Sequence, residues 1–203
     1  MFTVDVATGA VSDAVLASDV DSETSLGAYQ WSPGRNALLF ARHGIGIVEH
    51  DLTTHEERTI VALPPDVYVT PGRGCAWAPD GQSLAYSVRQ GRGRDSRIVL
   101  YLRLADGTTR ELFRVGPPEG LMLQGWTPDA RSVYVLRRLV SSGSTPPRDQ
   151  LWRIPTDGGA PVFTGTAAPG LRNVAIHPEG RSIAYVAGYP DWDLWSLEHP
   201  ALR

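Results

Sequence analysis

The sequence has a single cysteine and lacks the segments that direct a chain into or across a membrane. Cys75 alone cannot form an intramolecular disulfide or a cysteine-based metal site, and its apolar neighbours predict a buried side chain. No window approaches the roughly 18 apolar residues of a membrane-spanning helix. The opening residues, 1–6, contain neither a basic segment nor the apolar core of a secretion signal. As written, the chain is expected in the cytoplasm, or in the periplasm if the gene begins upstream.

Recognisable catalytic motifs are also missing. There is no Gly-x-Ser-x-Gly nucleophile elbow, no phosphate loop, no His-Glu-x-x-His and no dinucleotide fingerprint. His43 and His50 lie near Glu49 and Asp51, but their spacing fits no standard metal site, and a solvated loop is expected there. The formal net charge of −3 gives no reason to expect nucleic acid as a partner. We therefore expect no enzyme, cofactor, metal, nucleic-acid partner or membrane insertion.

What the sequence does contain is a five-residue phrase, of the type Trp-Ala-Pro-Asp-Gly, that recurs four times. Each copy is followed by a short run of β-favouring residues. A period of about 40–50 residues built on short strands is typical of propeller blades. The prolines of the four copies are 46, 49 and 50 residues apart: Pro33, Pro79, Pro128 and Pro178.

The second copy shows how one repeat is built. Its Pro79-Asp80-Gly81 sequence predicts a tight turn, because Pro presets φ and Gly accepts the left-handed conformation. In the first copy Gly34 stands in the Asp position and Arg35 in the Gly position. A non-Gly residue at positive φ costs about 1 kcal/mol, so we expect a shifted turn there, with Asn36 in the left-handed region. Four antiparallel strands are expected: 74–77, 83–88, 97–102 and 110–115.

Applied to the whole chain, this plan predicts one all-β domain. The expected fold is a β-propeller of four-stranded antiparallel blades, with about four blades. The two chain ends would overlap by one strand, so the ring would be small, incomplete, or completed by a second copy in a homodimer. An open arc would expose apolar blade faces. The predicted divisions are a partial blade at 1–18, blades at 24–63, 72–115 and 121–164, and a partial blade at 171–198.

Two phrases, residues 77–86 and 151–159, resemble the WD40-like (PD40) repeats of TolB-type β-propellers, and the resemblance extends from about residue 24 to the end. Residues 192–198 are similar to the last blade of propellers attached to bacterial kinases and winged-helix regulators. The resemblance implies six or seven blades, an interaction role and, for TolB itself, a periplasmic place in an envelope complex. This chain has fewer repeats and begins without a signal peptide. The shared motif residues are structural, so the resemblance implies no catalytic residue.

In a propeller, the loops between second and third strands and those between blades emerge on one face, and the Pro-Asp-Gly turns lie on the other. The long irregular segments gather on the first face: 64–73, 90–96, 141–150, 167–172 and 188–192. Loops on a rigid scaffold commonly carry binding, and Tyr, Trp and Arg dominate interface hot spots. We therefore predict that this face binds a protein or peptide through Tyr68, Arg73, Arg92, Arg94, Arg148, Tyr189 and Trp192.

The leading interpretation is a non-catalytic TolB-like propeller that serves as a protein-interaction or sensor scaffold. One alternative is the gating propeller of a prolyl-oligopeptidase-like peptidase, for which a hydrolase domain would follow residue 203. A second is a propeller lyase or lactonase with a central metal ion.

Overall fold

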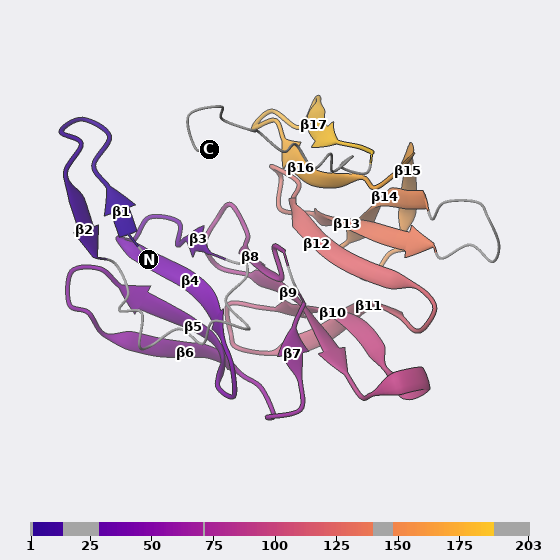
Figure 1. Ribbon diagram of the computed structural model, residues 1–203, viewed down its shortest axis with the longest axis horizontal. Coiled ribbons are helices and arrows are strands. Elements are labelled where there is room, and N and C mark those ends of the chain that lie inside the picture. The colour runs from indigo at the N-terminus through magenta and orange to yellow at the C-terminus, as the bar shows by residue number, and fades with distance from the viewer. Residues whose placement is uncertain (1, 14–28, 71, 140–147, 189–203) are drawn as a thin grey trace, which may run out of the picture.

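The computed structural model describes residues 2–13, 29–70, 72–139 and 148–188, and these ranges consist almost entirely of short antiparallel β-strands (Figure 1). One 3₁₀ turn, Gly93–Asp95, is the helical element among the described residues. No helix in these ranges is long and apolar enough to cross a membrane. The predicted all-β class is confirmed.

The strands form three larger sheets and two small ones, and every pair of neighbours is antiparallel. The first sheet has the order β3 (Gln30–Trp31), β4 (Ala37–Arg42), β5 (Gly46–Asp51), β6 (Glu57–Ala62). In the second, β7 (Tyr68–Val69) and β8 (Cys75–Trp77) both pair with β9 (Leu84–Gln90), followed by β10 (Arg97–Arg103) and β11 (Thr109–Val115). The third has the order β12 (Gly120–Trp126), β13 (Ser132–Leu139), β14 (Arg148–Pro155), β15 (Val162–Pro169).

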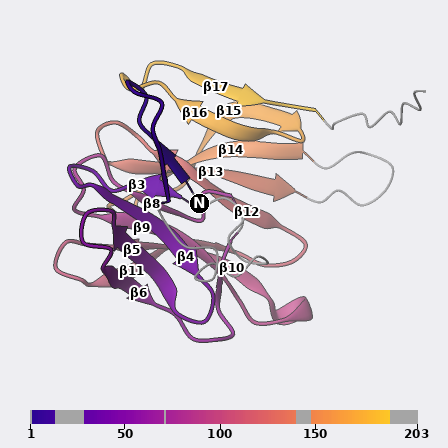
Figure 2. The same ribbon diagram turned by 60° about the vertical axis from the view of Figure 1, so that its left-hand side comes forward.

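Two-stranded sheets stand at either end of the described chain. They are β1 (Phe2–Val4) with β2 (Val11–Asp13), and β16 (Arg172–Ile176) with β17 (Ile183–Val186). The last residues of the predicted partial blades at 1–18 and 171–198 lie outside the described residues. In both views the larger sheets follow one another in chain order around an arc, with β16 and β17 beyond β12 to β15 (Figure 1, Figure 2).

The hydrophobic core lies between successive sheets, because strands of the middle sheet are buried on both faces. Along β8, Cys75 and Trp77 pack toward the first sheet, whereas Ala76 packs toward the third. This alternation follows from the period of two in a strand. It explains why residues 75–78 and 84–88 are buried at every position and apolar at all of them but Ser87.

The repeated phrase forms the predicted tight turn in the second and third sheets. Gly81 donates its backbone N–H to Ala78 and has φ +68°, and Ala130 takes the equivalent position with φ +56°. In the first sheet the turn keeps the same positions, because Arg35 donates its N–H to the oxygen of Ser32 as Gly81 does to Ala78, so the predicted shift was wrong. What differs is the left-handed residue, which is Gly34 with φ +70°. The expectation for Asn36 was wrong, because the glycine directly after Pro33 takes the left-handed conformation without strain and forms a type II-like turn.

These turns also pack against one another. A Cβ atom added to Gly81 would lie 3.3 Å from Cβ of Pro33, and one added to Gly180 would lie 3.3 Å from Cγ of Pro128. The glycine of one turn therefore sits close to the proline of the turn in the preceding sheet. The phrase consequently serves a contact between sheets as well as a turn within one.

The innermost strand of the second sheet is divided in two, which corrects the prediction that 64–73 is entirely a loop. Tyr68 and Val69 form β7 and pair with the end of β9. Thr70 donates its N–H to the oxygen of Ser87 at 2.9 Å, and Ser87 donates back to the oxygen of Gly74 at 2.8 Å. Because Thr70 and Gly74 share one partner, Gly72 and Arg73 leave the hydrogen-bonded ladder.

A second correction concerns the predicted loops at 141–150 and 167–172. Residues 167–169 belong to β15 and pair with 148–150 of β14. Gly165, with φ +86°, lies where the pairing register shifts, so β15 continues past this irregularity instead of ending there. The sheet is therefore longer at this end than its sequence indicates.

Candidate functional site

The loop face, defined as the ends of the sheets opposite the Pro-Asp-Gly turns, carries the described residues predicted to bind a partner. Tyr68 pairs with Arg89 across β7 and β9, and its side chain is 38% exposed. Arg92 and Arg94 lie in and beside the exposed 3₁₀ turn that follows β9. Neither arginine forms an ion pair with a carboxylate in the described part of the chain. The structure thus brings Tyr68, Arg92 and Arg94 to one end of the second sheet.

Two other predicted residues, Arg73 and Arg148, belong to other parts of the described chain. Arg73 is exposed at the break between β7 and β8, and Arg148 is exposed at the start of β14 in the third sheet. Tyr189 and Trp192 lie outside the described residues. The role of all seven residues in binding stays a prediction.

Tyr68 has an aromatic neighbour that the sequence did not associate with it. His43, in the turn between β4 and β5, stacks on Tyr68 with ring centroids 5.5 Å apart and planes inclined by 11°. Both residues are exposed. The pair joins the loop faces of the first and second sheets and forms a flat amphipathic surface.

A cavity of about 200 Å³ opens on the loop face between the second and third sheets. Its lining is mostly apolar, with Ile98, Leu121 and Met122 among the residues that form it. Arg89 and Arg138 contribute the two charged side chains. We refer to this feature as the loop-face cavity.

Both of these arginines are held in place by neighbours. Nε of Arg138 donates to Oδ1 of Asp149 at 2.7 Å, and Asp149 is only 1% exposed. Nη1 of Arg89 donates to Oγ of Ser96 at 3.2 Å. Two arginines fixed in this way at the rim of an apolar cavity can select a ligand that has both a negatively charged group and an apolar group.

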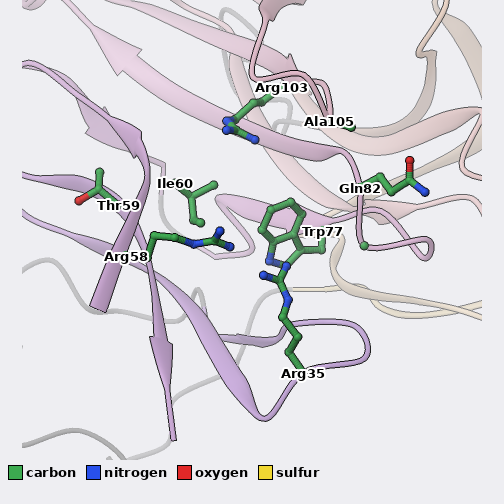
Figure 3. Close-up of a pocket in the computed structure, with 9 residues that line it drawn as sticks. Arg35, Arg58, Thr59, Ile60, Trp77, Gln82, Arg103 and Ala105 are labelled. Carbon is green, nitrogen blue, oxygen red and sulfur yellow. The ribbon is translucent and has the colours of Figure 1, made fainter. Parts of the chain in front are cut away.

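A larger cavity, of about 340 Å³, lies between the first and second sheets at the end where the Pro-Asp-Gly turns are found (Figure 3). We call it the seam cavity. Its lining is mostly polar and includes Arg35, Arg58, Arg103 and Gln82, with Trp77 forming an aromatic wall. Figure 3 shows the guanidinium groups of Arg35 and Arg58 pointing toward the indole of Trp77.

Glu49 positions two of the three arginines. Its Oε1 accepts hydrogen bonds from Nη1 of Arg35 and Nη2 of Arg58, each at 2.9 Å. Its Oε2 accepts the hydroxyl of Ser32 at 2.6 Å. Glu49 is 6% exposed, so this carboxylate is buried with three donors around it. Arg58 faces Glu49 across β5 and β6, and Arg35 is the last residue of the turn between β3 and β4.

The histidine pair does not lie in a solvated loop as expected. His43 is exposed in its turn, but β5 continues to Asp51, and His50 is therefore a strand residue only 8% exposed. Its Nδ1 lies 3.7 Å from Oε1 of Glu57. Within the described ranges, no three His, Cys, Asp or Glu side chains gather in a way that could hold a metal ion.

Comparison with solved structures identifies the architecture. Oligogalacturonate lyase in complex with manganese superposes with a TM-score of 0.53, at 12% identity over 88% of this chain. Oligogalacturonate lyase from Vibrio parahaemolyticus gives a TM-score of 0.50, at 9% identity over 90% of this chain. The chain has a β-propeller fold.

The propeller spans 62% of the length of each of these two lyases. No protein-family model matches its sequence, and the search of curated proteins gives no match either. At these identities the likeness shows the fold alone.

The seam cavity was not predicted from the sequence, because its residues are far apart in the chain and belong to different sheets. Arg35 and Arg103 are separated by 68 positions. One signal was present: Arg35 occupies the position that glycine fills in the second copy of the phrase. All 19 basic residues of the chain are arginines, since the sequence contains no lysine. The presence of an arginine therefore does not by itself indicate a binding site. Arg35 is distinguished only because it replaces the glycine of the repeated phrase.

Proposed function

We propose that this propeller is a non-catalytic binding module of the TolB-like kind, and that its loop face binds an extended segment of a partner protein. The loop-face cavity carries this proposal. Its apolar floor has room for one apolar side chain, and Arg89 and Arg138 at its rim suit a carboxylate beside that side chain. The expected ligand is a peptide in which an apolar residue is flanked by Asp or Glu.

The surroundings of the cavity support a peptide rather than a compact small molecule. Thr70 on its lining follows directly after β7, so the exposed pair of Tyr68 and His43 continues the surface toward the first sheet. Arg92 and Arg94 flank it on the other side of β9. Tyrosine supplies a large contact area with few rotatable bonds, and interface hot spots are enriched in both tyrosine and arginine.

The proposal is tested with an array of short peptides in which apolar and acidic residues are varied, followed by fluorescence anisotropy on the best sequence. Arg89→Glu should weaken binding at least about tenfold, because an attraction becomes a repulsion at the rim. Arg153→Glu is the matched control, since Arg153 is an exposed arginine on β14 near the opposite end of its sheet. A peptide that binds both variants as it binds the parent would show that the loop face is not the binding surface.

A lyase remains the second candidate, because both solved structures described above are oligogalacturonate lyases. One of them was determined with manganese. The described residues of this chain offer no gathered set of ligands for such an ion, so we derive no metal-dependent step. Incubation with oligogalacturonate and Mn²⁺, followed by ultraviolet detection of an unsaturated product, tests this candidate. Product formation that depends on the protein would replace the non-catalytic proposal.

A further inference from the structure

We propose that the seam cavity binds a small organic anion through a carboxylate or phosphate group. The cavity lies at the turn end of the first and second sheets, away from the loop face, and is independent of the proposed peptide site. Its volume of about 340 Å³ is at the lower end of the range for small-molecule sites.

The first observation is a buried donor without an acceptor. Trp77 is 5% exposed, and its indole Nε1 has no hydrogen-bond partner among the described residues. Leaving such an N–H unsatisfied costs about 1–3 kcal/mol. The equivalent tryptophan of the third sheet, Trp126, has a partner, because its Nε1 donates to the backbone oxygen of Ala76 at 2.8 Å. The missing acceptor at Trp77 is therefore specific to the boundary between the first and second sheets.

The second observation is an excess of positive charge around the same cavity. Three guanidinium groups line it, those of Arg35, Arg58 and Arg103. Two carboxylates compensate: Glu49, which is shared by two of the arginines, and Asp106 in the turn after β10. Asp106 already accepts the backbone N–H and the hydroxyl of Thr108, at 2.9 and 2.7 Å. Among the described residues one positive charge is left over, and the bonds to Glu49 and Leu104 use only part of the guanidinium N–H donors.

The third observation is how these groups are arranged. Cζ of Arg35 lies 5.6 Å from the centroid of the Trp77 ring, so the guanidinium stacks over the indole. An anion bound to Arg35 inside the cavity would therefore lie near Trp77, which forms part of the cavity wall. Arg103 comes from a different strand, β10, and within the described residues its guanidinium donates to the backbone oxygen of Leu104 at 3.5 Å and lies near Asp106. Arginine forks suit the paired oxygens of carboxylates and phosphates.

Because Glu49 fixes Arg35 and Arg58 before any ligand arrives, the site is largely preformed. Arg103 is not part of that network and is the residue whose loss should affect binding more than folding. Gln82 lines the same cavity and can donate or accept, which allows it to contact a hydroxyl or carbonyl group on the body of the ligand.

The test follows the indole N–H signals by ¹H–¹⁵N NMR while inorganic phosphate or citrate is added at constant ionic strength. Trp77→Phe assigns the Trp77 signal. The expected result is a saturable shift of that signal with one or both anions, and little change at Trp126, whose N–H is already bonded. The anion that saturates at lower concentration identifies phosphate or carboxylate as the preferred group.

Arg103→Gln should weaken the affinity about tenfold or more, since it removes one charge-assisted contact. Arg131→Gln is the matched control, because Arg131 follows the turn of the third sheet at the same end of the molecule but does not line this cavity. Thermal unfolding of both variants establishes that they are folded. The proposal is overturned if neither anion moves the Trp77 signal at concentrations up to about 10 mM. Equal weakening by Arg131→Gln would also overturn it.

Discussion

The indole nitrogen of Trp126 donates a 2.8 Å hydrogen bond to the backbone oxygen of Ala76 and so joins the innermost strands of two adjacent sheets. Side-chain oxygens make further bonds of this kind: that of Gln30 accepts the backbone N–H of Trp77, and that of Gln124 accepts the backbone N–H of Val174. The sheets of this propeller are therefore held together by polar contacts near their inner strands as well as by the apolar core.

Trp126→Phe should lower the free energy of unfolding by about 1–2 kcal/mol more than Trp77→Phe. Both changes remove one pyrrole ring from a buried site, but only the first leaves the Ala76 oxygen without the indole N–H. Urea unfolding of the two variants in a buffer without phosphate or other multivalent anions measures the difference. Equal losses would mean that the bond between Trp126 and Ala76 contributes nothing measurable.

The left-handed residue of the repeated turn provides a second matched pair. Gly81→Ala should lower the free energy of unfolding by about 1 kcal/mol, because it places a side chain at φ +68° and close to Pro33. Ala130→Gly relieves the same strain at φ +56° and should be neutral or stabilising by up to about 1 kcal/mol, after the entropy of the more flexible unfolded chain is subtracted. Thermal unfolding measures both. Destabilisation by Ala130→Gly as large as that by Gly81→Ala would contradict this reading of the turn.

Glu49→Gln should lower the free energy of unfolding by about 1–2 kcal/mol, because two arginines lose their shared carboxylate while Ser32 keeps an acceptor. The figure is modest because the side chains of Arg35 and Arg58 are 39% and 62% exposed. Glu111→Gln is the control: its partner Arg114 is on the surface, and a loss below about 0.5 kcal/mol is expected. Chemical denaturation of the two variants side by side gives the comparison.

The buried thiol of Cys75 predicts how the stability of the protein changes with pH. Burial raises the pKa of its thiol from 9.0 to about 12, so the folded state holds the proton that the unfolded state releases. Stability should therefore be complete below pH 9 and fall as pH rises toward 12. Burial also raises the pKa of Tyr86, and Cys75→Ala should reduce the alkaline loss without abolishing it. In the parent, a thiol reagent at pH 8 should react only upon unfolding; rapid reaction of the folded protein would contradict this prediction.

The association state in solution is a further prediction. Large apolar side chains are exposed on the first sheet and on the last two, among them Trp31 at 54%, Phe163 at 41% and Tyr185 at 47%. Covering them in a homodimer would give a mass twice the 22.0 kDa of the chain, measurable by light scattering. Trp31→Ser should shift the equilibrium toward the monomer. A monomeric mass for the parent at micromolar concentrations would exclude the dimer.

Much of the fold could be predicted from local patterns. Turn residues at fixed spacing, with β-favouring runs between them, place the strands of the three larger sheets close to where they occur. The errors arise where long-range pairing overrides a local pattern. The prolines around Tyr68 and Val69 are typical of a loop, but β9 has unpaired positions beyond β8, and those two residues occupy them.

The candidate sites were less accessible to prediction. Exposed arginines on loops could be found from the sequence, because loop position follows from topology. The seam cavity depends on Arg58, Trp77 and Arg103 meeting across two sheets, and no local pattern encodes that meeting. The sequence showed Glu49 as a carboxylate near His43 and His50, but it did not show that Arg35 and Arg58 are its partners.

The close contact between the glycine of one turn and the proline of the preceding one has a consequence for how such a chain can grow. A sheet whose turn reads Pro-Asp-Gly carries both partners of such a contact, a proline like Pro33 or Pro128 and a glycine like Gly81 or Gly180. A duplicated segment of this length would therefore arrive with a ready-made interface on each side. Adding a whole sheet would require no new kind of contact at the turn end. Inserting one residue into a turn, in contrast, would disturb the contacts of that turn with both of its neighbours.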